Sequence, residues 1–216
     1  MKHKYAVFDW DGTLADTYPV ISAAYDYTFD KMGLLRIPYD EVKRITSTLQ
    51  NKDTLGHIFK ERRDEAAVYF YEYIQKYHTD RLAAMPGAAE LLEYCRRAGM
   101  EIYLITNKKT RFIHEEIEKL GFGAYFKKVV AAGEYEQDKP HPTACHAVFD
   151  NCLPPAERIV VIGDGEADVK TAACYDHDGG KAAAVIYDPK HKYGGAQPTL
   201  KVDSLTAVID FLEKNG

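Results

Sequence analysis

The stretch YAVFDWDGTL, residues 5–14, decides how this chain folds, because an apolar run ends there in two aspartates. Residues 5–8 are mostly β-branched or aromatic and carry no charge, which predicts a buried strand. Asp9 and Asp11 follow it, and two close carboxylates must be neutralised or kept apart. A divalent cation such as Mg²⁺ is the usual remedy, and Gly12 permits a tight turn with backbone N–H groups facing an anion. The stretch therefore predicts phosphoryl chemistry at a strand end.

Composition limits the class of protein. A length of 216 residues allows one domain or a core with a modest insertion. A formal net charge of −5 argues against a general binder of nucleic acid or acidic membranes. The four cysteines form no Cys-x-x-Cys pair, and neither a signal peptide nor an apolar run of about 20 residues is visible. We therefore expect a cytoplasmic protein that binds neither nucleic acid nor membrane.

A helical block interrupts the chain after the first motif. Between residues 19 and 77 the apolar residues follow helical spacing, and no convincing strand is present. The pattern predicts four helices, at residues 20–32, 39–45, 55–59 and 66–77. We expect residues 17–84 to form an inserted helical domain.

Strands and helices alternate from residue 85 onward. Strands are predicted at 102–105, 128–131, 158–162 and 182–187. Helices are predicted at 88–97, 111–120, 142–151, 167–174 and 204–213. This alternation is typical of an α/β fold with a doubly wound parallel sheet, here formed by residues 1–16 and 85–216. Ligands bind such sheets at the carboxyl ends of the strands.

Four polar motifs fall at predicted strand ends. They are DWDGT at 9–13, TNK at 106–108, DKPHP at 138–142 and GDGEAD at 163–168. Each alone would also suit a turn or a helix cap. Four of them in order, on one edge of one predicted sheet, indicate a single site.

In this order the motifs resemble those of the haloacid dehalogenase superfamily, in the branch with a helical cap between the first and second motifs. The resemblance spans nearly the whole chain and is greatest to phosphoglycolate phosphatase-like enzymes. It implies a Rossmann-like core, a bound Mg²⁺ and a phosphatase that forms an aspartyl-phosphate. The chain departs from the pattern where Asp176 replaces the usual glycine, in an extended loop at 175–181.

The resemblance implies roles for the aspartates. Asp9 would be the nucleophile and a metal ligand, and Asp11 the general acid and base, with its backbone carbonyl on the metal. Asp164 would be a direct metal ligand. Asp168 would hold a metal-bound water or orient Lys139.

The remaining motif residues would bind the phosphoryl group. Thr106 would donate its hydroxyl, with the backbone N–H of Asn107 beside it. Lys139 would supply the compensating cation. Gly12 and Thr13 would form the turn around the phosphate.

The substrate is expected to be a small phosphorylated metabolite, selected by the helical domain. The candidate residues lie in one polar turn: Arg44, Thr46, Ser47, Gln50, Asn51 and Lys52. Arg44 or Lys52 could meet a substrate carboxylate or a second phosphate, although ordinary solvated residues explain each equally well. The motifs do not separate phosphoglycolate from a sugar phosphate, a nucleotide or pyrophosphate.

A phosphomutase resembling β-phosphoglucomutase is the main alternative. Mutases of that kind hold an acidic residue directly before the aspartate of the fourth motif, where this chain has Gly163. They also often carry Gly-Val where this chain has Gly12 and Thr13. Both features favour hydrolysis, by either a monomer or a homodimer.

Overall fold

The computed structural model describes residues 2–46 and 54–215. The chain divides into two compact units, one of Met1–Asp16 with Ala83–Gly216 and one of Thr17–Leu82. The second boundary comes two residues before the predicted end of the insert, at residue 84. The reason is a short antiparallel ribbon, in which β2 (Ala15–Asp16) pairs with β3 (Ala83–Ala84) and so ties both connecting segments to the first unit.

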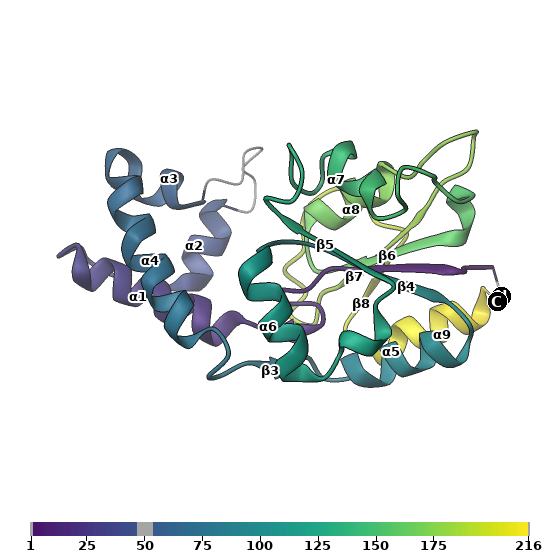
Figure 1. Ribbon diagram of the computed structural model, residues 1–216, viewed down its shortest axis with the longest axis horizontal. Coiled ribbons are helices and arrows are strands. Elements are labelled where there is room, and N and C mark those ends of the chain that lie inside the picture. Colours follow the sequence, from purple (N-terminus) through teal and green to yellow (C-terminus); the bar gives the residue numbers. More distant parts are fainter. Residues whose placement is uncertain (1, 47–53, 216) are drawn as a thin grey trace. The chain divides into compact units, whose positions relative to one another are not determined.

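Six parallel strands form the sheet of the first unit, in the order β5-β4-β1-β6-β7-β8 (Figure 1). Their bounds are β1 Tyr5–Phe8, β4 Glu101–Lys109, β5 Lys128–Ala132, β6 Ile159–Gly163, β7 Ala183–Tyr187 and β8 Leu200–Val202. β1 lies in the middle of the sheet, between β4 and β6. A strand covered on both faces must be apolar throughout, which explains the uncharged run before Asp9. The predicted α/β fold with a parallel sheet is confirmed.

Helices cover both faces of this sheet. They are α5 Ala88–Arg97, α6 Thr110–Leu120, α7 Pro142–Ala147, α8 Glu166–Ala173 and α9 Thr206–Lys214, with 3₁₀ turns at Gly123–Tyr125 and Ala156–Arg158. On one face, Val7, Tyr103 and Val161 form a buried cluster with Cys145 of α7 and Ala172 of α8. On the other face, α5 and α6 pack on β4, and α9 packs against α5 (Figure 1). Both faces of the strands are therefore withdrawn from water.

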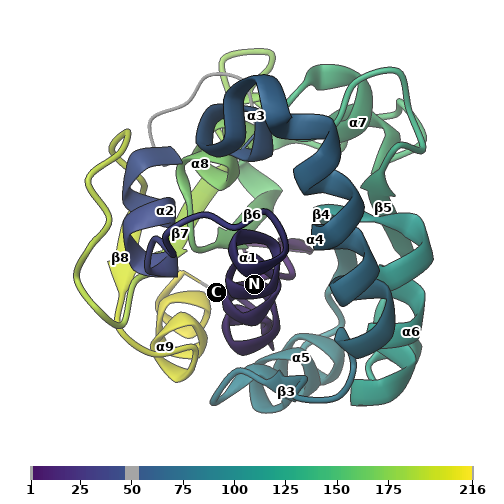
Figure 2. The same cartoon turned by 90° about the vertical axis from the view of Figure 1, so that its left-hand side faces the viewer.

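The second unit consists of helices. They are α1 Tyr18–Lys31, α2 Tyr39–Thr46, α3 Thr54–Phe59 and α4 Arg63–Tyr77, with a 3₁₀ turn at Lys60–Arg62. α1 packs along α4 (Figure 2), around a core rich in aromatic rings such as Tyr25, Phe29 and Phe59. The four helices predicted for this block are present. Within residues 2–46 and 54–215, no helix is long and apolar enough to cross a membrane.

Three predicted elements of the first unit differ in extent, and three short strands, β2, β3 and β8, were not predicted. The strand expected at 102–105 continues to Lys109, so the second motif at 106–108 lies inside β4 and not after it. The helix expected at 142–151 ends at Ala147, because Asp150 and Asn151 adopt left-handed backbone angles, with φ of 51° and 61°. The last helix begins at Thr206 rather than at residue 204. The strand β8 is only three residues long and lies at the sheet edge, so its sequence carries little alternation to detect.

We expect the protein to lose stability on acidification through His3, which is 1% exposed and stacks on Phe211 of α9. Burial, assisted by Lys2, lowers the pKa of His3 from 6.5 to about 4. Between these two values the unfolded chain binds a proton that the folded chain does not, so stability falls as the pH drops through this window. The loss approaches about 3 kcal/mol at its lower end. Urea unfolding at pH 7.5, 6.5, 5.5 and 4.5 measures it.

The matched variants for this measurement are His3→Phe and His114→Phe. His3→Phe keeps the ring against Phe211 and should flatten the pH dependence of the unfolding free energy. His114 is exposed on α6, so His114→Phe should retain the wild-type slope. Parallel curves for wild type and His3→Phe would show that His3 contributes nothing to acid sensitivity.

Candidate active site

The loops that follow β1 and β6 and the last residues of β4 meet at the carboxyl edge of the sheet. Phe8 pairs with Leu104 of β4 on one side and with Ile162 of β6 on the other. The Asp9 amide continues this ladder by donating to the Ile162 carbonyl at 2.9 Å. The residues that follow these positions are therefore neighbours at this edge, which brings the first, second and fourth motifs together.

Lys139, from the loop after β5, lies between two carboxylates at this edge. Its Nζ atom is 2.6 Å from Asp9 Oδ1 and 2.5 Å from Asp168 Oδ1. It also donates to the Ile105 carbonyl at 3.2 Å. The exposed fractions of the three side chains are 2% for Lys139, 12% for Asp9 and 3% for Asp168. One buried cation is thus shared by two buried carboxylates, and the cluster keeps an excess of negative charge.

The excess charge affects the protonation of Asp9. Burial raises the pKa of this carboxyl group to about 6; Lys139 opposes the rise, and the Asp168 carboxylate adds to it. For Lys139, burial works to lower the pKa, but Asp168 and Asp9 outweigh it and the pKa is raised. Lys139 therefore remains a cation at neutral pH, and the cluster would be stabilised by a further positive charge.

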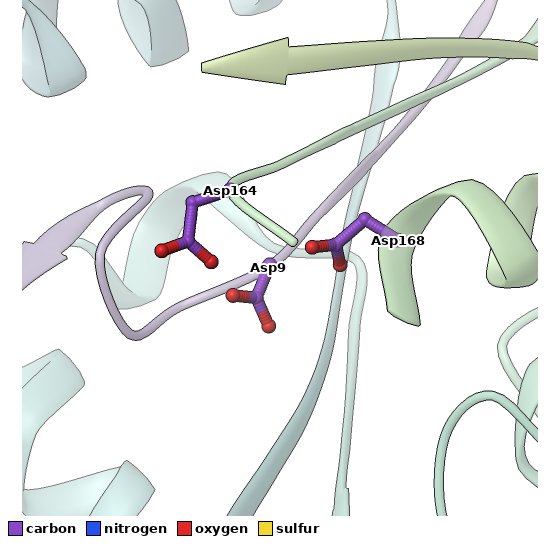
Figure 3. A group of neighbouring side chains, drawn as sticks. All are labelled: Asp9, Asp164 and Asp168. Atoms are coloured by element: carbon purple, nitrogen blue, oxygen red, sulfur yellow. The ribbon is translucent and has the colours of Figure 1, made fainter. Parts of the chain in front are cut away.

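Three carboxylates at this edge could bind a metal ion, which would supply that positive charge. Oxygens of Asp9, Asp164 and Asp168 all lie within 4.8 Å of one another. Figure 3 shows them gathered from the end of β1, the loop after β6 and the start of α8. An all-carboxylate set of hard oxygen donors fits Mg²⁺ rather than a softer transition metal. The donors present therefore fit the ion that the motifs implied.

The turn at Gly12 and Thr13 uses two of its amides for hydrogen bonds inside the loop. The Gly12 amide donates to the Ala15 carbonyl at 2.9 Å, and the Thr13 amide to the Trp10 carbonyl at 3.2 Å. Gly12 has a φ of +80°, and a Cβ there would lie 2.5 Å from Asp164 Oδ2. These two amides are therefore engaged inside the loop, and phosphate binding by this turn stays a prediction. Gly12 provides the space that the Asp164 carboxylate occupies.

Asp11 projects to a different neighbour from Asp9. Its Oδ1 atom accepts a hydrogen bond from Lys108 Nζ at 2.6 Å, and its side chain is 31% exposed. This carboxylate is outside the three-aspartate cluster among the described residues. The metal contact expected of Asp11 is through its backbone carbonyl, and it stays a prediction.

The second motif places two polar groups beside the first. Thr106 is 2% exposed, and its Oγ1 accepts a hydrogen bond from the Lys108 amide at 3.1 Å. That bond leaves the hydroxyl proton available to donate. Within the described part of the chain, the buried Oδ1 of Asn107 has no hydrogen-bond partner. The contacts of Thr106 and of the Asn107 backbone with phosphate stay predictions.

The predicted substrate residues belong to the helical unit or lie outside the described residues. Arg44 is in α2, where its exposed guanidinium pairs with Glu41. The Thr46 position ends that helix. The other four candidates lie outside the described residues: Ser47, Gln50, Asn51 and Lys52. Selection of the substrate by any of them is a prediction.

Two residues beside the site were given no role by the motif pattern. Lys108 belongs to the second motif, and it contacts both Asp11 and Glu116. Glu116 is fully buried on α6, on the same face as Ile113 and Ile117. Glu116 lies one helical turn after the core residue Phe112, on the apolar face of an amphipathic helix. A glutamate at such a position is the sequence signal that could have identified this residue.

We expect Gly163→Ala to disrupt the buried ion cluster. A Cβ at this last residue of β6 would lie 1.9 Å from Asp168 Cγ and 2.4 Å from Asp168 Cβ. Asp168 must then move, which separates it from Lys139. Overpacking of this kind costs about 1–3 kcal/mol, or more where an ion pair is also broken. Urea unfolding measures the loss, with Gly194→Ala as the control, since a Cβ there meets nothing within 4 Å. Equal stabilities for the two variants would contradict the tight fit.

Known proteins resemble this chain along nearly its whole length. It is 29% identical over 216 residues to a phosphoglycolate phosphatase from Pseudomonas fluorescens, covering 95% of this chain and 78% of that protein. Among solved structures, a predicted phosphoglycolate phosphatase from Haemophilus somnus superposes with a TM-score of 0.82 at 17% identity, covering 98% and 99% of the two chains. The HAD-hydrolase YfnB from Bacillus subtilis, in a structure bound to magnesium, superposes with a TM-score of 0.74 at 17% identity, covering 99% and 100%.

The family model for haloacid dehalogenase-like hydrolases matches residues 6–176. That span holds all four motifs, from Asp9 to Asp168. The names of the curated relatives agree with the predicted enzyme class, a phosphatase. The chain therefore belongs to the haloacid dehalogenase-like hydrolase family, as its motifs predicted.

Proposed function

We propose that the protein is a Mg²⁺-dependent phosphomonoester hydrolase that acts on a small phosphorylated metabolite through an aspartyl-phosphate. The observation that carries the proposal is the buried cluster of Asp9, Lys139 and Asp168, with Asp164 beside it. A carboxylate held by a lysine at a strand end, next to a set of metal ligands, is equipped to attack phosphorus. The first unit would be the catalytic core, and Thr17–Leu82 the cap that selects the substrate.

In the first half of the reaction, a carboxylate oxygen of Asp9 attacks the phosphorus atom. The bond between phosphorus and the leaving oxygen breaks, and Asp11 gives that oxygen a proton. Lys139 balances the charge of Asp9 and of the phosphoryl group, while the Thr106 hydroxyl donates to a phosphoryl oxygen. The aspartyl-phosphate and the free alcohol are the products of this step.

In the second half, water attacks the phosphorus of the aspartyl-phosphate. Asp11, now a carboxylate, takes the proton of that water, and the bond to Asp9 breaks to release inorganic phosphate. Asp9, Asp164 and the backbone carbonyl of Asp11 would hold Mg²⁺, which when bound neutralises negative charge shared by Asp9 and the phosphoryl oxygens. Asp168 orients Lys139 by their contact at 2.5 Å.

Gly163 weighs against the phosphomutase alternative. In this chain no side chain fits at position 163, because even a Cβ would meet Asp168. The acidic residue that such mutases hold directly before the fourth-motif aspartate is therefore not merely absent but sterically excluded here. Hydrolysis is the better supported reaction.

A screen for phosphate release tests the proposed function. Purified protein with Mg²⁺ is offered phosphorylated metabolites. Phosphoglycolate is the first choice because the curated relatives are named phosphoglycolate phosphatases. Sugar phosphates, nucleotides and pyrophosphate complete the panel. We expect turnover of at least one phosphomonoester and its loss when EDTA replaces Mg²⁺. Absence of phosphate release from every compound, or turnover that EDTA does not change, would contradict the proposal.

A further inference from the structure

A chain of polar contacts runs from Asp11 into the interior of the first unit. Lys108 Nζ is 2.6 Å from Asp11 Oδ1 and 3.1 Å from Glu116 Oε1. The other oxygen of Glu116, Oε2, accepts a hydrogen bond from Trp10 Nε1 at 2.7 Å. Strand β4, helix α6 and the loop after β1 thus meet in one network beside the proposed acid and base.

The inner part of this network is shielded from water and fixed in place. Glu116 and Trp10 are fully buried, and the Lys108 side chain is 9% exposed. The Trp10 ring packs edge-on against Phe122, with ring centres 6.3 Å apart. Both carboxylate oxygens of Glu116 are occupied, so it can rotate only by breaking a buried contact, which is costly.

The charge on Lys108 is maintained by its two partners. Burial works to lower the pKa of Lys108, but the carboxylates of Asp11 and Glu116 outweigh it and raise the pKa. Burial also raises the pKa of Glu116, against the opposing effect of Lys108. Lys108 is therefore an ammonium ion, held on one side by α6 and turned on the other side to Asp11.

We propose that Lys108 is a positioning residue: it holds Oδ1 of Asp11, so that the other carboxyl oxygen, Oδ2, carries the proton that Asp11 exchanges with the leaving oxygen. Glu116 and Trp10 fix the ammonium, and the ammonium fixes Oδ1 of Asp11. The Asp11 side chain is still 31% exposed, so it is anchored at one oxygen and open to a substrate. The inference rests on the proposed function, in which Asp11 is the acid.

Orientation of this kind has a large effect on rate. A displacement of about 1 Å in a reacting group can cost about 100-fold, because the proton must travel along a short hydrogen bond. A purely structural network would change how much enzyme is folded. It would not change how the folded enzyme discriminates between leaving groups. The two roles are therefore separable by experiment.

The test compares two substrates that differ in their need for an acid. An alkyl phosphomonoester releases an alkoxide that must be protonated, whereas p-nitrophenyl phosphate releases a stable phenolate that needs no proton. The ratio of the two kcat/KM values is independent of the fraction of folded enzyme. It reports protonation of the leaving oxygen, since kcat/KM covers the steps up to its departure.

The main variant is Lys108→Met with Glu116→Gln, which removes the cation and its buried counter-charge together. Glu116→Gln alone is the companion variant: Gln keeps an acceptor for Trp10 but loses the second acceptor that holds Lys108, so its effect on the ratio should lie between those of wild type and the double variant. We expect the double variant to lose about 10- to 100-fold in kcat/KM for the alkyl substrate and less than about 3-fold for the aryl substrate. Trp10→Phe, which removes no charge, should lower the same ratio by about 3- to 10-fold.

The outcomes separate this inference from the proposed function. Equal losses on both substrates, or no loss, in the double variant would overturn the positioning role alone. If the double variant does not fold, an unchanged ratio in Trp10→Phe would overturn it. Wild-type protein that releases phosphate from no compound of the panel and from neither of these two substrates would overturn the proposed function and this inference together.

Discussion

Asp9→Asn is expected to abolish phosphate release while leaving the metal-free protein more stable than wild type. The loss of activity should be about 10⁴-fold or more, because the amide oxygen does not attack phosphorus. Phosphate release with Mg²⁺ and urea unfolding in EDTA measure the two effects. A substitution that lowers activity and raises stability identifies a residue whose role in catalysis destabilises the folded protein.

The gain in stability follows from the pKa of Asp9. Its value rises from 3.8 in the unfolded chain to about 6 in the folded protein, chiefly through burial. Above pH 6 the folded state must hold a carboxylate that the unfolded state holds more easily, so ionisation of Asp9 lowers stability there. The difference corresponds to about 1–3 kcal/mol at pH 7.5. Asn removes that charge from beside Asp168, and its benefit should shrink as the pH falls below about 6.

Asp210→Asn is the control for this experiment, because Asp210 is exposed on α9. It should leave both activity and stability near the wild-type values. An Asp9→Asn protein that still releases phosphate would show that another group is the nucleophile. An Asp9→Asn protein that is less stable at pH 7.5 would show that the ion pair with Lys139 outweighs the burial of the charge.

The strand ends could be predicted from the sequence because the information there is local. An uncharged run such as residues 5–8 specifies a buried central strand, and the residues that follow it must leave the sheet at its carboxyl edge. The same reasoning applied to Asp164, whereas Thr106, which was expected just after its strand, lies inside β4 because that strand continues to Lys109. Which residues meet at this edge then depends only on the parallel pairing of β1 with β4 and β6. The alternation of strands and helices along the sequence already implied a parallel sheet.

The partners of those residues could not be predicted in the same way. Trp10 and Glu116 are separated by 106 positions, and their contact depends on how α6 packs on β4. The fit of Asp164 against Gly12 is also a tertiary feature, since it depends on two loops from neighbouring strands. The motif at 9–13 predicts a turn whose amides face an anion, and the internal hydrogen bonds of the Gly12 and Thr13 amides could not be read from it. Local sequence specifies which groups are present, and packing decides what they touch.

Lys139→Met is expected to destabilise the protein more than any other single change at the site. It leaves Asp9 and Asp168 buried together without their cation. Breaking a buried ion pair by removing one partner costs about 3–5 kcal/mol, since the remaining charges cannot be solvated. Urea unfolding in EDTA at pH 7.5 measures the loss. Phosphate release should fall at the same time, because the charge of the attacking carboxylate is no longer balanced.

A second substitution should separate the charge effect from the loss of packing around the lysine stem. Lys139→Met combined with Asp168→Asn removes one of the two orphaned carboxylates, so stability should recover by about 1–3 kcal/mol relative to Lys139→Met alone. Activity should not recover, since Asp9 still lacks its cation.

Lys170→Met is the matched control for the Lys139→Met measurement. Lys170 pairs with Glu166 at 2.7 Å but is 51% exposed, and loss of such a surface pair costs about 1 kcal/mol or less. If Lys139→Met were no more costly than Lys170→Met, the two carboxylates would have to be reached by water, and burial could not be what raises the pKa of Asp9.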